Sequence, residues 1–229
     1  QNSTTNNLEQ TVSKALYDSV YLDPALRDAR GYILSAEQPD FPTVIAFINA
    51  LSKSGIQIHR ATSAFSVAGK SYPEGSFVVK TAQAFRPHVV DMFEPQNHPN
   101  DFQYPGGPPV RPYDAAGWTL ALQMGVQFDR ILDHFEGPFE QLSYGQIVKS
   151  SSTIVPSKTG YVIKRATNQA FKIVNQLLKN NISVYEITQN GTAYPKGDFY
   201  VAANAEPVLQ KINANTGIAK QTLVAVRKK

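Results

Sequence analysis

The stretch YPEGSFVV at residues 72–79 decides the fold, because a second version of it, YPKGDFYV, lies at residues 194–201. Both stretches read Tyr-Pro-x-Gly-x-Phe-x-Val, a pattern specific enough to indicate an internal repeat. An earlier match, GYIL at residues 31–34 against GYVI at residues 160–163, keeps the same order along the chain. The sequence therefore predicts a duplicated unit.

The repeat divides the chain into parts that we expect to form one compact domain. Residues 1–22 are a lead-in and a helix, residues 23–149 are the first copy, and residues 150–229 are the second copy. Residues 1–149 carry 11 Lys and Arg against 15 Asp and Glu, a net of −4, whereas residues 150–229 carry 11 against 3, a net of +8. A basic half can favour an acidic partner. No nucleic-acid-binding motif accompanies the charge, so we expect no nucleic-acid partner.

The first copy shows which elements the unit contains. An apolar run at residues 31–34 precedes a helical apolar face at residues 44–51, and a second predicted strand, IQIH, follows at residues 56–59. A strand, a helix and a strand with short connections are typical of a parallel βαβ unit. Residues 65–79 add a hairpin-like excursion. We therefore predict an α/β fold of duplicated βαβ-plus-hairpin units in a three-layer, mostly parallel, flavodoxin-like sheet sandwich.

One segment has no counterpart in the second copy. The offset between the copies falls from 122 residues at the Tyr-Pro-x-Gly stretch to 92 at Gly125 and Gly217, which leaves 30 residues, around 86–114, in the first copy alone. Six prolines from Pro95 to Pro112 argue against a helix or a central strand. Long loops inside compact domains are usually functional or disordered, and the aromatic content of this one argues against disorder. We expect this one to form an ordered lid over the carboxyl ends of the strands.

The candidate ligand-binding residues lie in and beside this insertion loop: Arg86, His88, Asp91, Glu94, His98, Tyr104, Arg111 and Trp118. The spacing His-x-x-Asp occurs twice and suits acid–base chemistry, or zinc where more ligands converge. The arginines can clamp a carboxylate or a phosphate, and the rings can stack on a sugar or a peptide side chain. Alternatively these groups satisfy one another. We expect Arg86 to pair with Asp91 or Glu94, and Tyr104 or Trp118 to pack beneath the loop. We assign no catalytic residue and no metal ligand.

The composition excludes several kinds of site. The chain has no cysteine, which removes disulfides, thiol nucleophiles and thiolate metal sites. No apolar run approaches the roughly 20 residues of a membrane-spanning helix. The sequence begins at Gln1 with neither a methionine nor a signal-like apolar segment, so we expect a mature form or a fragment of a longer protein.

Six stretches resemble a known family: RDARGYIL through QPDFP (27–42), GKSYP (69–73), KTAQAFRPH (80–88), DMFEP (91–95), YPGGPP (104–109) and QMGVQFDR (123–130). Together they resemble the region that follows the catalytic domain in large bacterial zinc carboxypeptidases of the carboxypeptidase A type. The resemblance covers residues 17–139 well and the second copy only loosely.

The resemblance implies a class I glutamine amidotransferase-like fold in a secreted or periplasmic bacterial protein. It also implies that zinc is held by a catalytic metallopeptidase domain elsewhere in the same parent chain. The family's zinc motif is His-x-x-Glu, and none of the four histidines here has glutamate at that spacing. No zinc ligand carries over, and glutaminase activity does not either, because it needs a cysteine. We expect no cofactor in this fragment.

The sequence supports three hypotheses about function. The first is a non-catalytic accessory domain of a zinc carboxypeptidase-like protein, which binds a peptide or cell-wall substrate or docks on the catalytic domain. The second is a self-sufficient hydrolase with a site at His88, Asp91, Glu94 and His98. The third is a solute-binding module that uses the cleft between the two copies.

Overall fold

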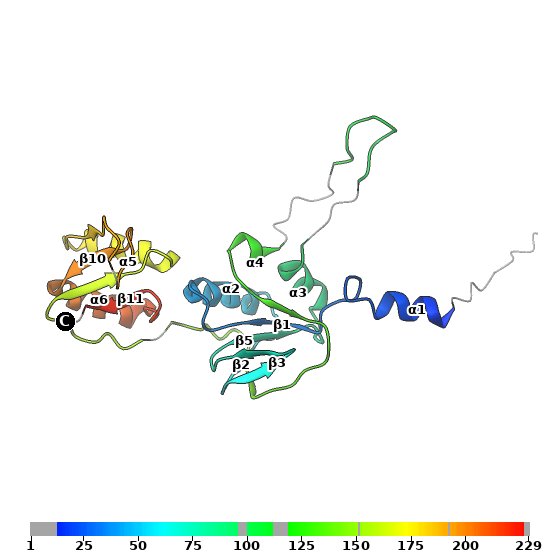
Figure 1. Ribbon diagram of the computed structural model, residues 1–229, viewed down its shortest axis with the longest axis horizontal. Coiled ribbons are helices and arrows are strands. Elements are labelled where there is room, and N and C mark those ends of the chain that lie inside the picture. The colour runs from blue at the N-terminus through cyan, green and yellow to red at the C-terminus, as the bar shows by residue number, and fades with distance from the viewer. Residues whose placement is uncertain (1–12, 96–99, 112–118, 151, 192, 227–229) are drawn as a thin grey trace, which may run out of the picture.

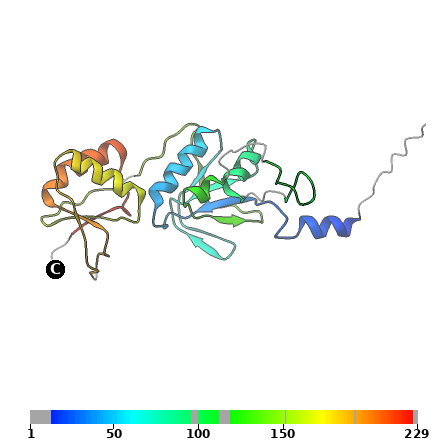
Figure 2. The same cartoon turned by 90° about the horizontal axis from the view of Figure 1, so that it is seen from above.

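The computed structural model describes residues 13–95, 100–111, 119–150, 152–191 and 193–226. The two copies lie side by side, each with a sheet and its own helices (Figure 1, Figure 2). Each copy also has a hydrophobic core of its own. Helix α1 (Lys14–Tyr21) stands apart at the far end of the first copy.

The first copy consists of β1 (Gly31–Leu34), α2 (Phe41–Lys53), β2 (His59–Ala61), β3 (Phe65–Val67), β4 (Lys70–Tyr72), β5 (Phe77–Lys80), α3 (Arg86–Phe93), α4 (Leu120–Gln123), β6 (Asp129–Ile131) and β7 (Phe139–Gln141). Its sheet has the order β6-β1-β5-β2-β7, and β3 and β4 form a separate hairpin. Every pair in it is antiparallel. The helices cover one face of the sheet, while the hairpin covers the other together with Phe135 and Phe139.

The second copy consists of β8 (Gly160–Ile163), α5 (Asn168–Lys179), β9 (Tyr185–Glu186), β10 (Phe199–Ala202), the 3₁₀ turn η1 (Ala203–Ala205), α6 (Glu206–Thr216) and β11 (Leu223–Ala225). Its antiparallel sheet has the order β11-β8-β10-β9. This order repeats β6-β1-β5-β2 of the first copy. Each copy is therefore a β-α-β-β-α-β unit of the ferredoxin-like kind.

The duplication extends to individual hydrogen bonds. The amide of Ala36 donates to Ser76 Oγ (3.1 Å) after β1, and the amide of Arg165 donates to Asp198 Oδ1 (2.9 Å) after β8. Gly75 and Gly197, the glycines of the two Tyr-Pro-x-Gly stretches, both have positive φ angles, 83° and 96°. Only glycine adopts such angles without strain, which explains why both copies have it there.

The mostly parallel, three-layer, flavodoxin-like sheet predicted from the sequence is wrong, and so is the glutamine amidotransferase-like fold. β1 and β2 do run in the same direction, as strands joined by a helix can. However, β5 inserts between them and pairs antiparallel with both. β1 is buried on both faces, and such strands read as continuous apolar runs, the pattern typical of parallel sheets. The apolar run therefore does not reveal the direction of the neighbouring strand.

Two further expectations need correction. Residues 86–93 form helix α3, because Pro87 lies in its first turn, where a missing N–H costs nothing. The strand expected at residues 56–59 starts at His59 instead. The backbone of Gln57 is bonded to the side chain of Gln83, whose Oε1 accepts from the Gln57 amide at 2.7 Å and whose Nε2 donates to the Gln57 carbonyl at 3.1 Å.

His59 lies on β2, and its Nδ1 atom is buried without a hydrogen-bond partner among the described residues. Burial lowers the pKa of His59 below its ordinary value, and the charge of Lys80 lowers it further, while Glu136 acts in the opposite direction. The folded state therefore favours the neutral imidazole.

We expect the chain to lose stability as the pH falls below about 6.5, the ordinary pKa of histidine. In that range His59 binds a proton more readily in the unfolded chain than in the folded chain. Protonation therefore stabilises the unfolded state and lowers the free energy of unfolding. Urea unfolding between about pH 8 and pH 5 measures the effect, which His59→Gln should reduce. His134→Gln is the matched control, because that ring is 83% exposed. An undiminished pH dependence in His59→Gln would contradict the assignment.

Candidate functional site

The insertion leaves the first copy where α3 ends, and a cluster of three side chains marks this place. The Tyr32 hydroxyl donates to Glu94 Oε1 at 2.8 Å, and Arg130 Nε donates to the same oxygen at 2.6 Å. Arg130 Nη2 also donates to the carbonyl of Arg27 at 2.6 Å. Burial, then the bond to Glu94, raises the pKa of Tyr32, which keeps its hydroxyl a donor. The cluster joins α3 to β1 and β6.

The two ends of the insertion are held together beside this cluster. The amide of Thr119 donates to the carbonyl of Asp91 (2.7 Å), and Thr119 Oγ1 donates to the carbonyl of Glu94 (2.8 Å). Thr119 has a φ angle of 57°, which is uncommon for a β-branched residue. The two hydrogen bonds fix this conformation and close the neck of the insertion.

Residues 100–111, which we call the arm, form a small ordered hairpin. A β-bridge joins Phe102 to Pro109, and the amide of Gly107 donates to the carbonyl of Tyr104 at 2.8 Å across Pro105-Gly106. Gly106 has a φ angle of 77°, so the proline and glycine occupy the central positions of a type II turn. The tip of the arm is therefore specified by its sequence.

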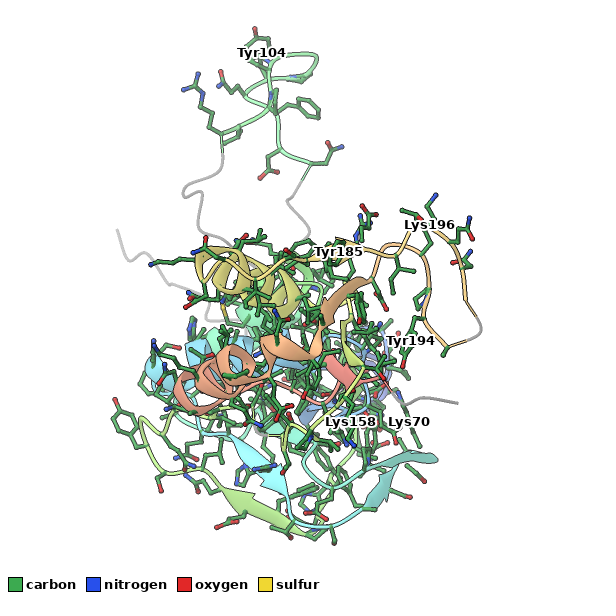
Figure 3. The ribbon with its side chains drawn as sticks, turned by 90° about the vertical axis from the view of Figure 1, so that its left-hand side faces the viewer. Lys70, Tyr104, Lys158, Tyr185, Tyr194 and Lys196 are labelled. Atoms are coloured by element: carbon green, nitrogen blue, oxygen red, sulfur yellow. The ribbon has the colours of Figure 1, made fainter. Side chains whose placement is uncertain are left out.

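The arm presents apolar side chains to solvent. Tyr104, Phe102 and Val110 are 61%, 51% and 42% exposed. The arm stands away from the first copy (Figure 1), and Tyr104 lies at its tip (Figure 3). The expectation that Tyr104 packs beneath a lid is wrong, since the hairpin points outward. The other ring named for that position, Trp118, lies outside the described residues.

Arg86 does not make the expected pair with Asp91 or Glu94. Its guanidinium instead bonds to Asp28 Oδ2 and, at 3.2 Å, to Thr81 Oγ1. Arg86 begins α3 and Glu94 follows its last residue, so about 12 Å of helix separates them. The expected pairing ignored this helix, which places the two residues at opposite ends.

The remaining candidates do not converge. His88 Nε2 lies 3.2 Å from Ser54 Oγ, near the end of α2, whereas Glu94 faces Tyr32 and Arg130. Arg111 is exposed at the base of the arm. His98 lies outside the described residues. The structure therefore does not bring His88 and Glu94 into one site.

The sequence analysis missed Tyr32, Thr119 and Arg130. A signal for the first was present, because Tyr32 matches Tyr161 in the repeat and Tyr161 also donates to a glutamate, Glu206 Oε2, at 2.6 Å. Burial and this bond raise the pKa of Tyr161 to about 12. A buried tyrosine in the same strand of both copies predicts a buried acceptor in both.

A second candidate site is a groove of about 830 Å³ between the copies. α2, residues 147–150, α5 and α6 line it, and the lining includes Lys149, Lys172 and Lys211 but no carboxylate of the described residues. Asp40 joins the two copies at one end of the groove. Its Oδ1 accepts from the amide of Thr43 in α2 (3.3 Å), and its Oδ2 accepts from the amide of Asn168 in α5 (3.1 Å). One carboxylate thus caps a helix of each copy.

The described part of the chain contains neither a candidate metal site nor a candidate membrane span. There, no three His, Asp or Glu side chains gather closely enough to bind a metal ion. Nor does that part contain a helix with the length and hydrophobicity needed to span a bilayer. Comparisons with family models, with curated proteins and with solved structures found no match to this chain.

Proposed function

We propose that this chain is a non-catalytic accessory domain of a secreted or periplasmic zinc carboxypeptidase-like protein. In this proposal it docks on the catalytic metallopeptidase domain of the same parent chain, and that domain holds the zinc. The parent protein is proposed from the resemblance of residues 17–139 to the zinc carboxypeptidase family. The docking role is proposed from the exposed side chains of the arm.

The arm supports a binding role because it exposes side chains that proteins normally bury. Phe102 and Tyr104 protrude on a hairpin whose turn and neck are both hydrogen-bonded. Aromatic side chains on a preorganised element lose little conformational entropy on binding and dominate many interfaces. Hydrophobic groups gathered on such an element are typical of an interaction site.

Helix α1, at the end of the first copy that lies away from the second copy (Figure 1), supports the same role. None of its residues is buried, and Leu16, Tyr17, Val20 and Tyr21 are exposed. An isolated helix of eight residues is marginal in water. Packing against a partner would stabilise it, so α1 is the second element that we expect at the docking surface.

A second candidate function, solute binding, is favoured by the groove between the copies. Its three lysines and its amide side chains suit an anionic, hydrogen-bonding ligand. The hydrolase hypothesis gains no such support, because His88 and Glu94 face different partners.

We expect the chain to bind a zinc carboxypeptidase catalytic domain of the resembling family, and the double variant Phe102→Ser/Tyr104→Ser to bind it at least tenfold more weakly. Central aromatic residues of an interface often contribute more than about 1.4 kcal/mol each, which is tenfold in Kd. The measurement is a titration followed by NMR, carried to millimolar concentration. This range is needed because a linked domain works at effective concentrations near millimolar.

The matched control is Tyr144→Ser, which removes an exposed ring from the first copy outside the arm. It should change Kd by less than about twofold, as most interface-neutral substitutions do. Absence of binding, or equal binding by the arm variant, would contradict the docking role. Binding that is lost only when the groove lysines are changed would place the docking surface at the groove and not at the arm.

A further inference from the structure

The two copies differ at one edge of the sheet. In the first copy, β7 pairs with β2 and adds a fifth strand. The equivalent of β2 in the second copy is β9, which pairs with β10 on one side. On its other side the described residues place no strand. The first copy therefore shows that this edge of the unit can pair with an added strand. In the second copy the same edge, on β9, is open among the described residues.

The hydrogen bonds show which backbone groups of β9 point outward. The amide of Ile187 donates to the carbonyl of Asp198 (2.8 Å), and the Ile187 carbonyl accepts from Gly197 (2.8 Å), so Ile187 faces β10. Because neighbours along a strand face opposite sides, Val184, Glu186 and Thr188 direct their N–H and C=O groups away from the sheet.

The equivalent groups of the first copy are all in use. The amide of Thr62, which matches Thr188, donates to the carbonyl of Pro138 at 2.8 Å. The carbonyl of Ile58, which matches Val184, accepts from the amide of Leu142 at 2.9 Å. Residues 138–142 are thus an observed example of a peptide bound along this edge of the unit.

The side chains indicate what kind of segment fits β9. Arg60 lies opposite Glu140 in the first copy, an opposite-charge pair across the strands. Its match in the second copy is Glu186, whose exposed carboxylate has no hydrogen-bond or ion-pair partner among the described residues. Such a carboxylate, in a copy with 11 Lys and Arg against 3 Asp and Glu, favours a basic residue directly opposite.

The neighbours of Glu186 favour apolar side chains. Tyr185 and Ile187 point to the opposite face of the sheet from Glu186, because side chains alternate along a strand. Tyr185 is 58% exposed, and its ring lies 6.5 Å from that of Tyr200. Figure 3 shows Tyr185 at the margin of the second copy. A strand added here would lie beside this ring, as β7 lies beside His59, which Gln141 faces across the pair.

We propose that the open edge of β9 binds an extended segment of another polypeptide as an antiparallel strand. The segment has a basic residue opposite Glu186 and apolar residues on both sides of it, against Tyr185 and Ile187. Main-chain hydrogen bonds give such strand addition its affinity, and the alternate side chains give its specificity. A second copy of this chain fits less well, since a two-fold pairing centred on Glu186 sets two carboxylates opposite each other. This inference does not depend on the docking role of the arm.

The test uses the full chain and two peptides, GPFEVLS, which copies residues 137–143 with valine in place of Gln141 so that both neighbours of the central residue are apolar, and GPFKVLS. Titration of the ¹⁵N-labelled chain should shift the amides of Glu186 and Thr188, and the lysine peptide should bind on the order of twofold to fivefold more tightly. Glu186→Lys should reverse this preference. Glu37→Lys, with the same change of charge at an exposed position of the first copy, should keep it.

Thr188→Pro removes one outward-pointing donor without removing a bond to β10, and it should weaken both peptides while distant amides keep their positions. The proposal is overturned if neither peptide shifts these amides at millimolar concentration. It is also overturned if Glu186→Lys leaves the preference unchanged. Concentration-dependent shifts of the same amides without peptide would instead place a second copy of the chain at this edge.

Discussion

Replacing Gly217 with alanine is expected to lower the free energy of unfolding by about 2–6 kcal/mol. Gly217 ends α6 with φ and ψ angles of 72° and 142°, a region that is essentially confined to glycine and costs another residue about 1–3 kcal/mol. A Cβ atom there would also lie 1.9 Å from the carbonyl oxygen of Ser150, in the segment between the copies. That segment would have to move, and overpacking of this kind costs about 1–3 kcal/mol more. Urea unfolding measures the loss.

The repeat provides the matched control for this substitution. Gly125 occupies the same position in the first copy, with a φ angle of 67°, and a Cβ atom there meets nothing within 4 Å. Gly125→Ala should therefore show the conformational cost alone, about 1–2 kcal/mol. Equal losses for the two variants would mean that the contact between Gly217 and Ser150 contributes nothing.

Replacing Glu94 with alanine is expected to cost about 2–4 kcal/mol, because the substitution removes two interactions at once. The Tyr32 hydroxyl loses its acceptor inside a fully buried residue, and Arg130 loses the carboxylate at 2.6 Å. The side chains of Glu94 and Arg130 are only 22% and 31% exposed, so water replaces the lost carboxylate poorly. Since Glu94 also lies at the neck of the insertion, the arm should lose order as well, visible as faster amide exchange at Thr119.

Glu206→Ala is the control for this prediction. Glu206 also accepts a hydrogen bond from a buried tyrosine, Tyr161, but no arginine of the described residues pairs with it, and Tyr161 keeps its contact with the Ser157 amide. We expect a loss of about 1–2 kcal/mol. If Glu94→Ala costs no more than Glu206→Ala, the ion pair with Arg130 adds no stability to the first copy.

The sequence by itself determined the internal repeat and the extra segment of the first copy. Matching side chains make matching contacts in the two copies, and these contacts explain why both copies share the pattern. Tyr32 and Tyr161 both bond to a glutamate, and Gly75 and Gly197 both adopt positive φ angles. The turn at the tip of the arm was also specified locally, since Pro105-Gly106 favours a type II turn wherever it lies.

Only the tertiary structure decided the direction of the strands and the partners of the charged side chains. β5 reaches the centre of the sheet because β1 and β2 both offer it a free edge, and nothing in the apolar run of residues 77–79 distinguishes this place from an edge. Arg130 meets Glu94 because β6 pairs with β1 across about a hundred residues of chain. Such pairings depend on which surfaces remain to be buried once local elements have formed, and that is a property of the whole fold and not of any segment.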